Sequence, residues 1–199
     1  MTEAQALKLV EQYIENHRYR PVRIETNKLP EGQKAPDFKV YKGASLTFYC
    51  EVKTPALNPN PSTGMFHWTT TISKLRELMH KAVKQFCDQD SGHTKPWVLF
   101  FTSDHFQLNW RNMAHSLQGI VGHGSNIIKD LTDQRYIKDT AKDIKEIDLI
   151  VWCQISSGQP KIYQMMQFGN AESPLLKELE RISDDLTPYS NEQIKGPNP

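Results

Sequence analysis

Hydrophobic and polar residues recur along the chain with two periods, and these periods separate helices from strands. Apolar residues return every three or four positions in residues 2–17 and again in 70–88, which predicts two amphipathic helices. Residues 21–27 alternate with a period of two, as a half-buried strand does. Residues 97–103 (WVLFFTS) are apolar without alternation, which is typical of a strand covered on both faces.

A β-hairpin is predicted in residues 35–53 (APDFKVYKGASLTFYCEVK), where two alternating runs meet at Gly43. The apolar positions of the two runs are Phe38, Val40, Leu46, Phe48, Cys50 and Val52. They share one face of the sheet only if the numbers of paired residues add up to an even total. A three-residue loop of Gly43, Ala44 and Ser45 gives a total of 88, so this is the connection that we expect.

The predicted register brings three polar side chains together. Asp37 and Glu51 also add up to 88, so they are expected directly across from each other, with Cβ atoms about 5 Å apart. Lys53 lies two residues beyond Glu51 and therefore on the same face. Two carboxylates at this separation repel each other unless a positive charge lies between them, and Mg²⁺ binds carboxylate oxygens. The residues alone leave a second interpretation open, in which Lys53 simply bridges two acids in a surface cluster.

The order of the elements predicts a mixed α/β fold, that is, an α+β arrangement with a mixed sheet. Three consecutive strands form an antiparallel meander, and the helix at 70–88 makes room for a crossover, so the strand at 97–103 can pair in parallel. Helices are expected on both faces of this sheet. Residues 1–183 are predicted to form one domain. Its later elements are a helix at 108–121 and strands at 146–155 and 161–168. Residues 184–199 follow the domain as a polar, flexible tail.

The hairpin motif resembles the signature of a known enzyme superfamily. Pro36-Asp37, a spacer of 13 residues and Glu51-Val52-Lys53 are similar to the motif of the PD-(D/E)xK nucleases, which include restriction endonucleases, archaeal Holliday-junction resolvases and RecB-type nuclease domains. These proteins share a core of a helix, a three-strand meander, a helix and a further strand. The order predicted for residues 3–103, about half of the chain, is similar. The resemblance therefore implies a restriction-endonuclease-like core with C-terminal additions.

The resemblance also implies roles for the residues of the motif. Asp37 and Glu51 match two metal ligands of the superfamily, and the backbone carbonyl of Val52 matches a third. Lys53 matches the lysine that orients or activates the attacking water. The metal is Mg²⁺ or Mn²⁺, which offsets the charge that develops on a phosphodiester during hydrolysis.

The first helix of many superfamily members adds an acid to the site. Two residues of this chain, Glu11 and Glu15, are candidates for that acid. Glu11 is favoured because it flanks the buried stripe of the predicted helix. A solvated helix acid remains the alternative for either residue.

The second helix of superfamily members often places a lysine or glutamine facing the metal. Lys81 and Gln85 match these residues, because they are four apart and lie on one helix face. Lys74 and Lys84 belong to the same segment, which carries a net charge of +3 between residues 74 and 84. A basic helix beside a carboxylate site suits a phosphate backbone. For Lys74, a solvated helix face is the alternative.

Composition and charge narrow the class of the protein. The 199 residues carry 24 Lys and Arg against 23 Asp and Glu, a formal net charge of +1. The first 100 residues hold 14 of these basic and 10 of these acidic residues, an excess that is compatible with a nucleic-acid face. No apolar run reaches the roughly 20 residues of a membrane span, and the N-terminal residues lack a signal-peptide pattern.

Three widely spaced cysteines, Cys50, Cys87 and Cys153, do not suggest a disulfide framework. We expect buried free thiols and a cytoplasmic location. No membrane partner is expected.

The sequence supports one leading function and two alternatives. The leading hypothesis is a metal-dependent nuclease that hydrolyses phosphodiester bonds, with DNA favoured as the substrate and a homodimer implied by a restriction-like role. The first alternative is a non-catalytic module on the same fold that binds nucleic acid or a protein. The second is an unrelated α+β domain in which the motif is accidental. In that domain the carboxylates of Asp37 and Glu51 lie more than about 8 Å apart.

Overall fold

Helices and strands follow one another in the predicted order through the first half of the chain. The computed structural model describes residues 1–56, 68–105, 108, 110, 113, 120–123, 126–130, 135–156, 159–166 and 175–186. The helical elements are α1 (Glu3–Asn16), a short 3₁₀ turn η1 (Thr26–Lys28), α2 (Trp68–Gln89), α4 (Arg135–Glu146) and α5 (Leu176–Leu186). The strands are β1 (Arg20–Arg23), β2 (Phe38–Lys42), β3 (Ser45–Lys53), β4 (Trp97–Ser103), β5 (Ile120–His123), β6 (Asn126–Asp130), β7 (Leu149–Ser156) and β8 (Gln159–Met166).

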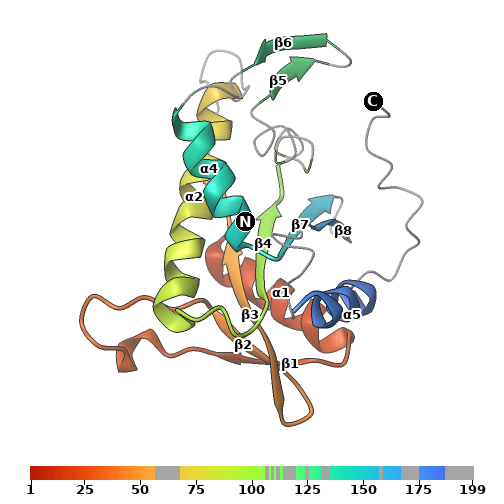
Figure 1. Cartoon of the computed structure of the whole chain (residues 1–199). Coiled ribbons are helices and arrows are strands. Elements are labelled where there is room, and N and C mark those ends of the chain that lie inside the picture. The colour runs from red at the N-terminus through yellow and green to blue at the C-terminus, as the bar shows by residue number, and fades with distance from the viewer. Residues whose placement is uncertain are drawn as a thin grey trace.

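Six strands form one mixed sheet in the order β1-β2-β3-β4-β7-β8, and β5 and β6 form a separate antiparallel pair. Strands β1, β2 and β3 are antiparallel, β3, β4 and β7 are parallel, and β8 is antiparallel to β7. The predicted parallel pairing of β4 is confirmed, with Glu51 opposite Leu99. Figure 1 shows α1 and α5 on one face of the sheet and α2 and α4 on the other. The predicted mixed α/β fold is therefore confirmed.

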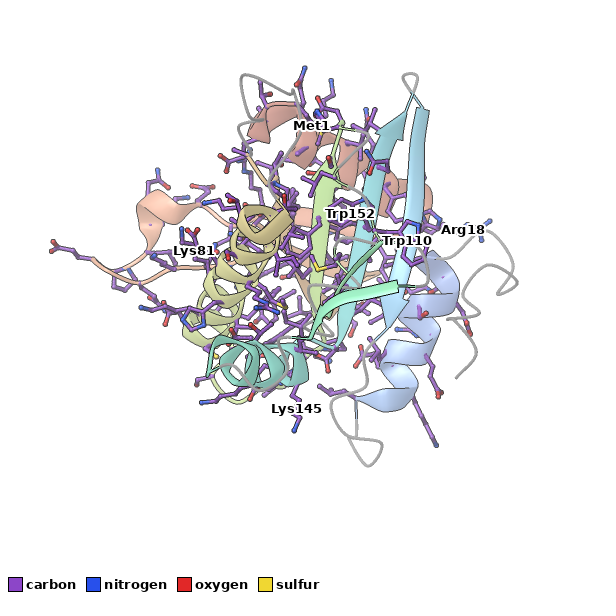
Figure 2. All side chains as sticks on the ribbon, turned by 90° about the horizontal axis from the view of Figure 1, so that it is seen from above. Met1, Arg18, Lys81, Trp110, Lys145 and Trp152 are labelled. Atoms are coloured by element: carbon purple, nitrogen blue, oxygen red, sulfur yellow. The ribbon has the colours of Figure 1, made fainter. Side chains whose placement is uncertain are left out.

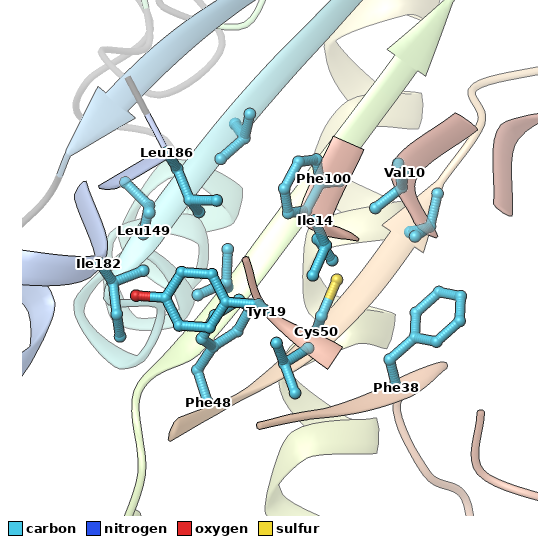
Figure 3. Packing of buried hydrophobic residues seen from close by; sticks show 14 of the residues in the cluster. Val10, Ile14, Tyr19, Phe38, Phe48, Cys50, Phe100, Leu149, Ile182 and Leu186 are labelled. Carbon is cyan, nitrogen blue, oxygen red and sulfur yellow. The ribbon is translucent and has the colours of Figure 1, made fainter. Parts of the chain in front are cut away.

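Each face of the sheet has its own hydrophobic core. Figure 3 shows the first core, in which α1 and α5 cover the sheet with Val10, Ile14, Ile182 and Leu186, packed against Phe38, Phe48, Cys50, Phe100 and Leu149. In the second core, α2 contributes Leu75, Met79, Ala82 and Phe86, which pack with Tyr49, Leu99, Phe101 and Trp152. Strand β3 takes part in both cores because successive side chains point to opposite faces. Glu51 and Lys53 alternate in step with Tyr49 and therefore face α2.

The first helix begins where the sequence predicts. Thr2 and Gln5 form a capping box, in which each side chain accepts a hydrogen bond from the backbone N–H of the other residue. The predicted apolar stripe is buried, and its residues are Ala6, Leu7, Val10 and Ile14. The cap fixes the start of α1, and the stripe holds the helix against the sheet.

The register of the β2–β3 hairpin is the predicted one near its open end. Phe38 pairs with Cys50, and Val40 pairs with Phe48. Both pairs have the predicted total of 88. All four side chains are fully buried in the first core, which explains why the apolar pattern was sufficient to specify this register.

The turn of this hairpin differs from the prediction. Lys42 pairs with Ser45, so the loop contains two residues, Gly43 and Ala44, and not three. Gly43 has a φ of 63°, a conformation that favours glycine. A register shift follows and leaves Thr47 as the extra residue of a β-bulge, which restores the total of 88. The bulge also explains why Leu46 packs against the second core instead of the first.

The end of the helix predicted at 108–121 is wrong. β5 begins at Ile120, and it forms a hairpin with β6 in which His123 lies opposite Asn126. Ile120 and Val121 are β-branched, and β-branched residues are enriched in strands. Most of the remaining residues of that predicted helix lie outside the described ranges.

The last described helix extends beyond the predicted domain boundary. α5 ends at Leu186, so residues 184–186 belong to a helix and not to the predicted tail. Leu186 is 1% exposed and packs in the first core, which explains why the helix continues past residue 183. Residues 187–199, the rest of the predicted tail, lie outside the described residues.

Two expectations drawn from composition can be compared with the structure. Cys50 and Cys153 are buried as predicted, but Cys87 is exposed because it lies on the outer side of α2. Within the described ranges, no helix combines the length and the apolar character that a bilayer span requires.

Candidate active site

The open end of the β2–β3 hairpin brings Asp37 and Glu51 together. The hairpin ladder starts with the pair of Phe38 and Cys50, and Asp37 and Glu51 are the next residues on the two chain segments. Their carboxyl groups are close enough to share a hydrogen bond. The predicted convergence of the two acids is therefore confirmed. The two carboxyl groups are therefore not separated by the more than about 8 Å expected of an accidental motif.

Each carboxylate accepts a hydrogen bond from the backbone of the opposite segment. The N–H of Asp37 donates to Glu51 Oε2 at 3.0 Å, and the N–H of Val52 donates to Asp37 Oδ2 at 2.8 Å. These two bonds continue the hairpin where its backbone ladder ends. The Glu51 side chain is only 2% exposed. The hairpin backbone thus holds both acids in place beside the second core.

Lys53 connects the two acids to helix α2. Its Nζ donates to Glu51 Oε1 and to Gln85 Oε1, the second at 2.7 Å. The amide of Gln85 also donates through Nε2 to the carbonyl of Ala35 at 2.9 Å. Gln85 therefore bridges the lysine at the end of β3 and the segment that leads into Asp37. The prediction that Gln85 faces the site is confirmed.

The surroundings of the two acids favour a bound positive charge. Burial and, to a lesser extent, the charge of Asp37 raise the pKa of Glu51 to about 8, although Lys53 acts in the opposite direction. Burial also raises the pKa of Asp37, although the N–H of Val52, the charge of Lys53 and a hydrogen bond from Glu51 oppose this effect. At neutral pH the pair therefore retains a proton. One lysine does not compensate for two buried carboxylates.

This donor set fits a hard divalent cation. Mg²⁺ and Mn²⁺ prefer oxygen ligands, and both side chains supply carboxylate oxygens. The backbone hydrogen bond from Val52 engages Oδ2 of Asp37, so Oδ1 is not used by a described backbone contact. No group of three or more His, Cys, Asp or Glu side chains gathers among the described residues. The residues available to hold a metal are thus Asp37 and Glu51, with the carbonyl of Val52 as the predicted third protein ligand.

One acid of α1 that the sequence did not single out, Glu3, acts electrostatically on Asp37. Burial is the main cause of the raised pKa of Asp37, and the charge of Glu3, in the first turn of α1, adds a small contribution in the same direction. Glu11 lies eight residues further along the helix, about 12 Å at 1.5 Å per residue. Among the described contacts, neither Glu11 nor Glu15 has one with either site acid. The helical pattern identified the buried stripe of α1 correctly, but it did not show which end of the helix faces the site.

The three lysines of α2 are partly or fully exposed, whereas its arginine, Arg76, is buried. Lys81 and Lys74 both form ion pairs with Glu77, at spacings of four and three residues. The Lys81 side chain is 53% exposed, and Figure 2 shows it pointing away from the sheet. Lys84 is exposed as well. Among the described contacts, Lys81 pairs with Glu77, whereas Gln85 contacts Lys53 of the site, so the role of Lys81 at a phosphate backbone stays a prediction.

The sequence did not predict that the residues before Asp37 are hydrogen-bonded to α2. The N–H of Lys34 donates to Asp88 Oδ2 at 3.2 Å, and Gln33 Nε2 donates to the backbone carbonyl of Asp88 at 2.9 Å. Contacts to backbone groups leave no signature in the residue types. The spacing of three between Gln85 and Asp88, which places both on one helix face, was the available signal.

The arrangement can hold a divalent cation on two carboxylates and present a lysine beside it. Such a site can stabilise the negative charge of a reacting phosphate or carboxylate group. Comparisons of the chain with protein-family models, with curated proteins and with solved structures found no match.

Proposed function

We propose that this protein is a metal-dependent nuclease that hydrolyses phosphodiester bonds in DNA, built on a restriction-endonuclease-like core. The observation that carries the proposal is the convergence of Asp37, Glu51 and Lys53 at the end of the β2–β3 hairpin, with Gln85 beside the lysine. Two further observations support it. The three residues fit the PD…ExK motif, and the order from α1 to β4 is similar to the order shared by that superfamily.

The two acids have the role of holding the metal. Asp37 offers Oδ1, and Glu51 offers a carboxylate whose burial makes a bound cation favourable. Mg²⁺ or Mn²⁺, when bound, supplies positive charge that offsets the charge developing on the phosphate. The backbone hydrogen bonds to both acids keep them in place while the ligand enters, so little reorganisation is needed.

Lys53 has the role of stabilising the attacking water and the phosphate. An ammonium group has three N–H donors, and the described contacts of Lys53 use two of them, toward Glu51 and Gln85. The third donor is left for a water or a phosphate oxygen. Gln85 holds the ammonium group at the end of β3, which fixes the direction of that third N–H. Lys53 thus places a positive charge where negative charge develops during hydrolysis.

The first experiment is a cleavage assay of the whole chain on plasmid and linear DNA. We expect cleavage products with Mg²⁺ or Mn²⁺ and none with a chelator. Without a bound cation, the two carboxylates repel an anionic phosphate. A homodimer and a cytoplasmic location stay predictions of the same proposal. RNA of the same length is the comparison substrate, and preferential cleavage of RNA corrects the substrate class.

The alternative is a non-catalytic binding module on the same fold. The observation that favours it is the ion pair between Lys53 and Glu51, which neutralises one buried acid without a metal. This alternative does not explain why a second acid, Asp37, whose pKa is raised by burial, lies beside Glu51. It predicts that the intact protein binds DNA or a protein partner but neither Mn²⁺ nor Mg²⁺.

We expect the double substitution Lys81→Ala and Lys84→Ala to weaken DNA binding and leave metal binding unchanged. Each lysine that neutralises a phosphate adds about one unit to the slope of log Kd against log salt concentration, so this slope should fall by about one to two. Fluorescence anisotropy of a labelled duplex at several salt concentrations measures it. The charge-matched control is Lys8→Ala with Lys177→Ala, both exposed on the helices of the opposite face. Equal slopes for the two double variants contradict a phosphate-binding role for α2.

A further inference from the structure

Residues 33–35, which we call the strap, are fastened to the C-terminal part of α2. Each strap residue has one hydrogen bond to the helix. Gln33 Nε2 donates to the Asp88 carbonyl at 2.9 Å, the N–H of Lys34 donates to Asp88 Oδ2 at 3.2 Å, and the carbonyl of Ala35 accepts from Gln85 at 2.9 Å. The strap leads through a single proline into Asp37. The position of a proposed metal ligand thus depends on how these bonds hold the strap.

Asp88 is an unusual residue for its place in the helix. It lies in the last turn of α2, where a negative charge is unfavourable beside the negative end of the helix dipole. The last turn of α2 has no basic residue to compensate for it. The N–H of Lys34 is the group that compensates for its carboxylate. Both the side chain and the backbone of Asp88 are therefore used to hold the strap.

One face of α2 reaches both sides of the candidate site. Gln85 and Asp88 are three residues apart and so lie on the same helix face. Through its amide, Gln85 contacts Lys53 on β3 as well as the strap. Because the same helix face holds the lysine and the segment before Asp37, any shift of the strap changes the position of Asp37 relative to Lys53.

The geometry points to Asp88 as a positioning residue of the site, which acts through the strap to fix Asp37 against Glu51 and Lys53. This inference rests on the proposed nuclease function. Asp88 has no described contact with either site acid, so it is not a ligand or a catalytic group. The effect of Asp88 on the site is indirect. Asp37 donates its N–H to Glu51, and its carboxylate accepts the N–H of Val52. A displacement of Asp37 therefore alters two of the bonds that shape the site. Mg²⁺ tolerates such distortion poorly because it requires nearly ideal octahedral geometry.

The test uses the full chain with three substitutions and a matched control. Asp88→Ala removes the acceptor of the Lys34 N–H, Asp88→Asn keeps an oxygen acceptor, and Gln33→Ala removes the second bond of the strap to Asp88. The control is Glu180→Ala, an exposed acid on α5. Asp88 lies at the surface with partial exposure and Gln33 is exposed, so the fold should persist, which circular dichroism checks.

Three readouts separate positioning from folding. We expect Asp88→Ala to weaken Mn²⁺ binding by about three- to tenfold in calorimetry, the factor that corresponds to the loss of one ordinary hydrogen bond. It should lower kcat by a similar factor with KM for DNA unchanged. It should also speed hydrogen exchange at the amides of Asp37 and Val52, but not at Phe100 in β4. Asp88→Asn should restore all three readouts, and Gln33→Ala should show a smaller change in the same direction.

Hydrogen exchange distinguishes a failure of this inference from a failure of the proposed function. If Asp88→Ala matches Glu180→Ala in exchange at Asp37 and Val52, the positioning role is overturned, whether or not the protein cleaves DNA. If exchange changes as expected but the unsubstituted protein neither binds Mn²⁺ nor cleaves DNA, the strap positions Asp37 and the nuclease function is overturned. If Asp88→Asn behaves like Asp88→Ala, the carboxylate charge and not the bond to Lys34 is responsible, which also overturns the inference.

Discussion

Substitution of Lys53 by alanine should reduce Mg²⁺-dependent cleavage of DNA by about a thousandfold, and Asp37→Ala should abolish it. Loss of one group that stabilises developing charge costs about a hundred- to a thousandfold in rate. Lys53 is the one cation that contacts both Glu51 and α2 in the described structure. Asp37 is a proposed metal ligand, and its backbone hydrogen bond engages Oδ2 and not Oδ1. Single-turnover cleavage of a labelled linear duplex measures both effects.

The two variants should differ in metal binding, which separates their roles. Asp37→Ala should show no Mn²⁺ binding in calorimetry because it removes a ligand. Lys53→Ala should still bind Mn²⁺, since the lysine competes with the metal for Glu51 instead of holding it. The matched control for the lysine is Lys177→Ala, exposed on α5 on the opposite face of the sheet. Cleavage that survives both substitutions contradicts the assignment of the site.

The metal-free protein should lose stability as the pH rises from about 5 to about 8. Burial raises the pKa of Glu51 to about 8 in the folded state, whereas the unfolded chain has a glutamate pKa of about 4.3. Between these values the folded protein holds a proton that the unfolded chain has lost. The free energy of unfolding therefore falls with pH, on the order of 1 kcal/mol per pH unit for one proton. Below this pH range, the contribution of protonated Glu51 to the free energy of unfolding is fully present. Above it, that contribution is lost, and Glu51 no longer makes stability depend on pH.

The comparison of wild type with Glu51→Gln isolates this contribution. Other groups titrate in the same range: the pKa of His93 is lowered by burial but raised overall by its hydrogen bond to Asp148. Both proteins share these groups, so the difference between their unfolding free energies at pH 5.5, 7 and 8.5 reports Glu51. We expect the wild-type curve to fall more steeply, and saturating Mn²⁺ to restore stability at pH 8.5 in the wild type alone. Parallel curves contradict a raised pKa at Glu51.

The sequence predicts the fold best where one strong pattern excludes the alternatives. The register of β2 against β3 follows from the apolar side chains of Phe38, Val40, Phe48 and Cys50, which must all lie on one face. The two-residue turn at Gly43 was missed because a bulge at Thr47 compensates for the shorter loop, and nothing in the apolar pattern distinguishes the two solutions. At Ile120, two apolar residues fit both a helix end and a strand. The segment forms a strand because it pairs with β6, and the residues around Ile120 do not reveal this pairing.

The site is predictable to the extent that it lies on the hairpin. Asp37, Glu51 and Lys53 follow from the register, and Gln85 follows from the helical spacing of α2. Contributions from other elements depend on how those elements are oriented, which periodicity does not specify. The role of Glu11 on α1 stays a prediction for this reason. The strap could not be predicted because two of its three bonds to α2 use the backbone of the strap and the third uses the backbone carbonyl of Asp88.

Anomalous diffraction from a crystal soaked in Mn²⁺ tests the central claim, that Asp37 and Glu51 hold a metal ion, most directly. The account predicts an anomalous peak about 2.1 Å from an oxygen of each carboxylate, with Lys53 still beside the pair and held by Gln85. Substitution of Asp37 by alanine should remove that peak from an isomorphous crystal. An empty site at saturating Mn²⁺, with the Lys53–Glu51 ion pair unchanged, would contradict it.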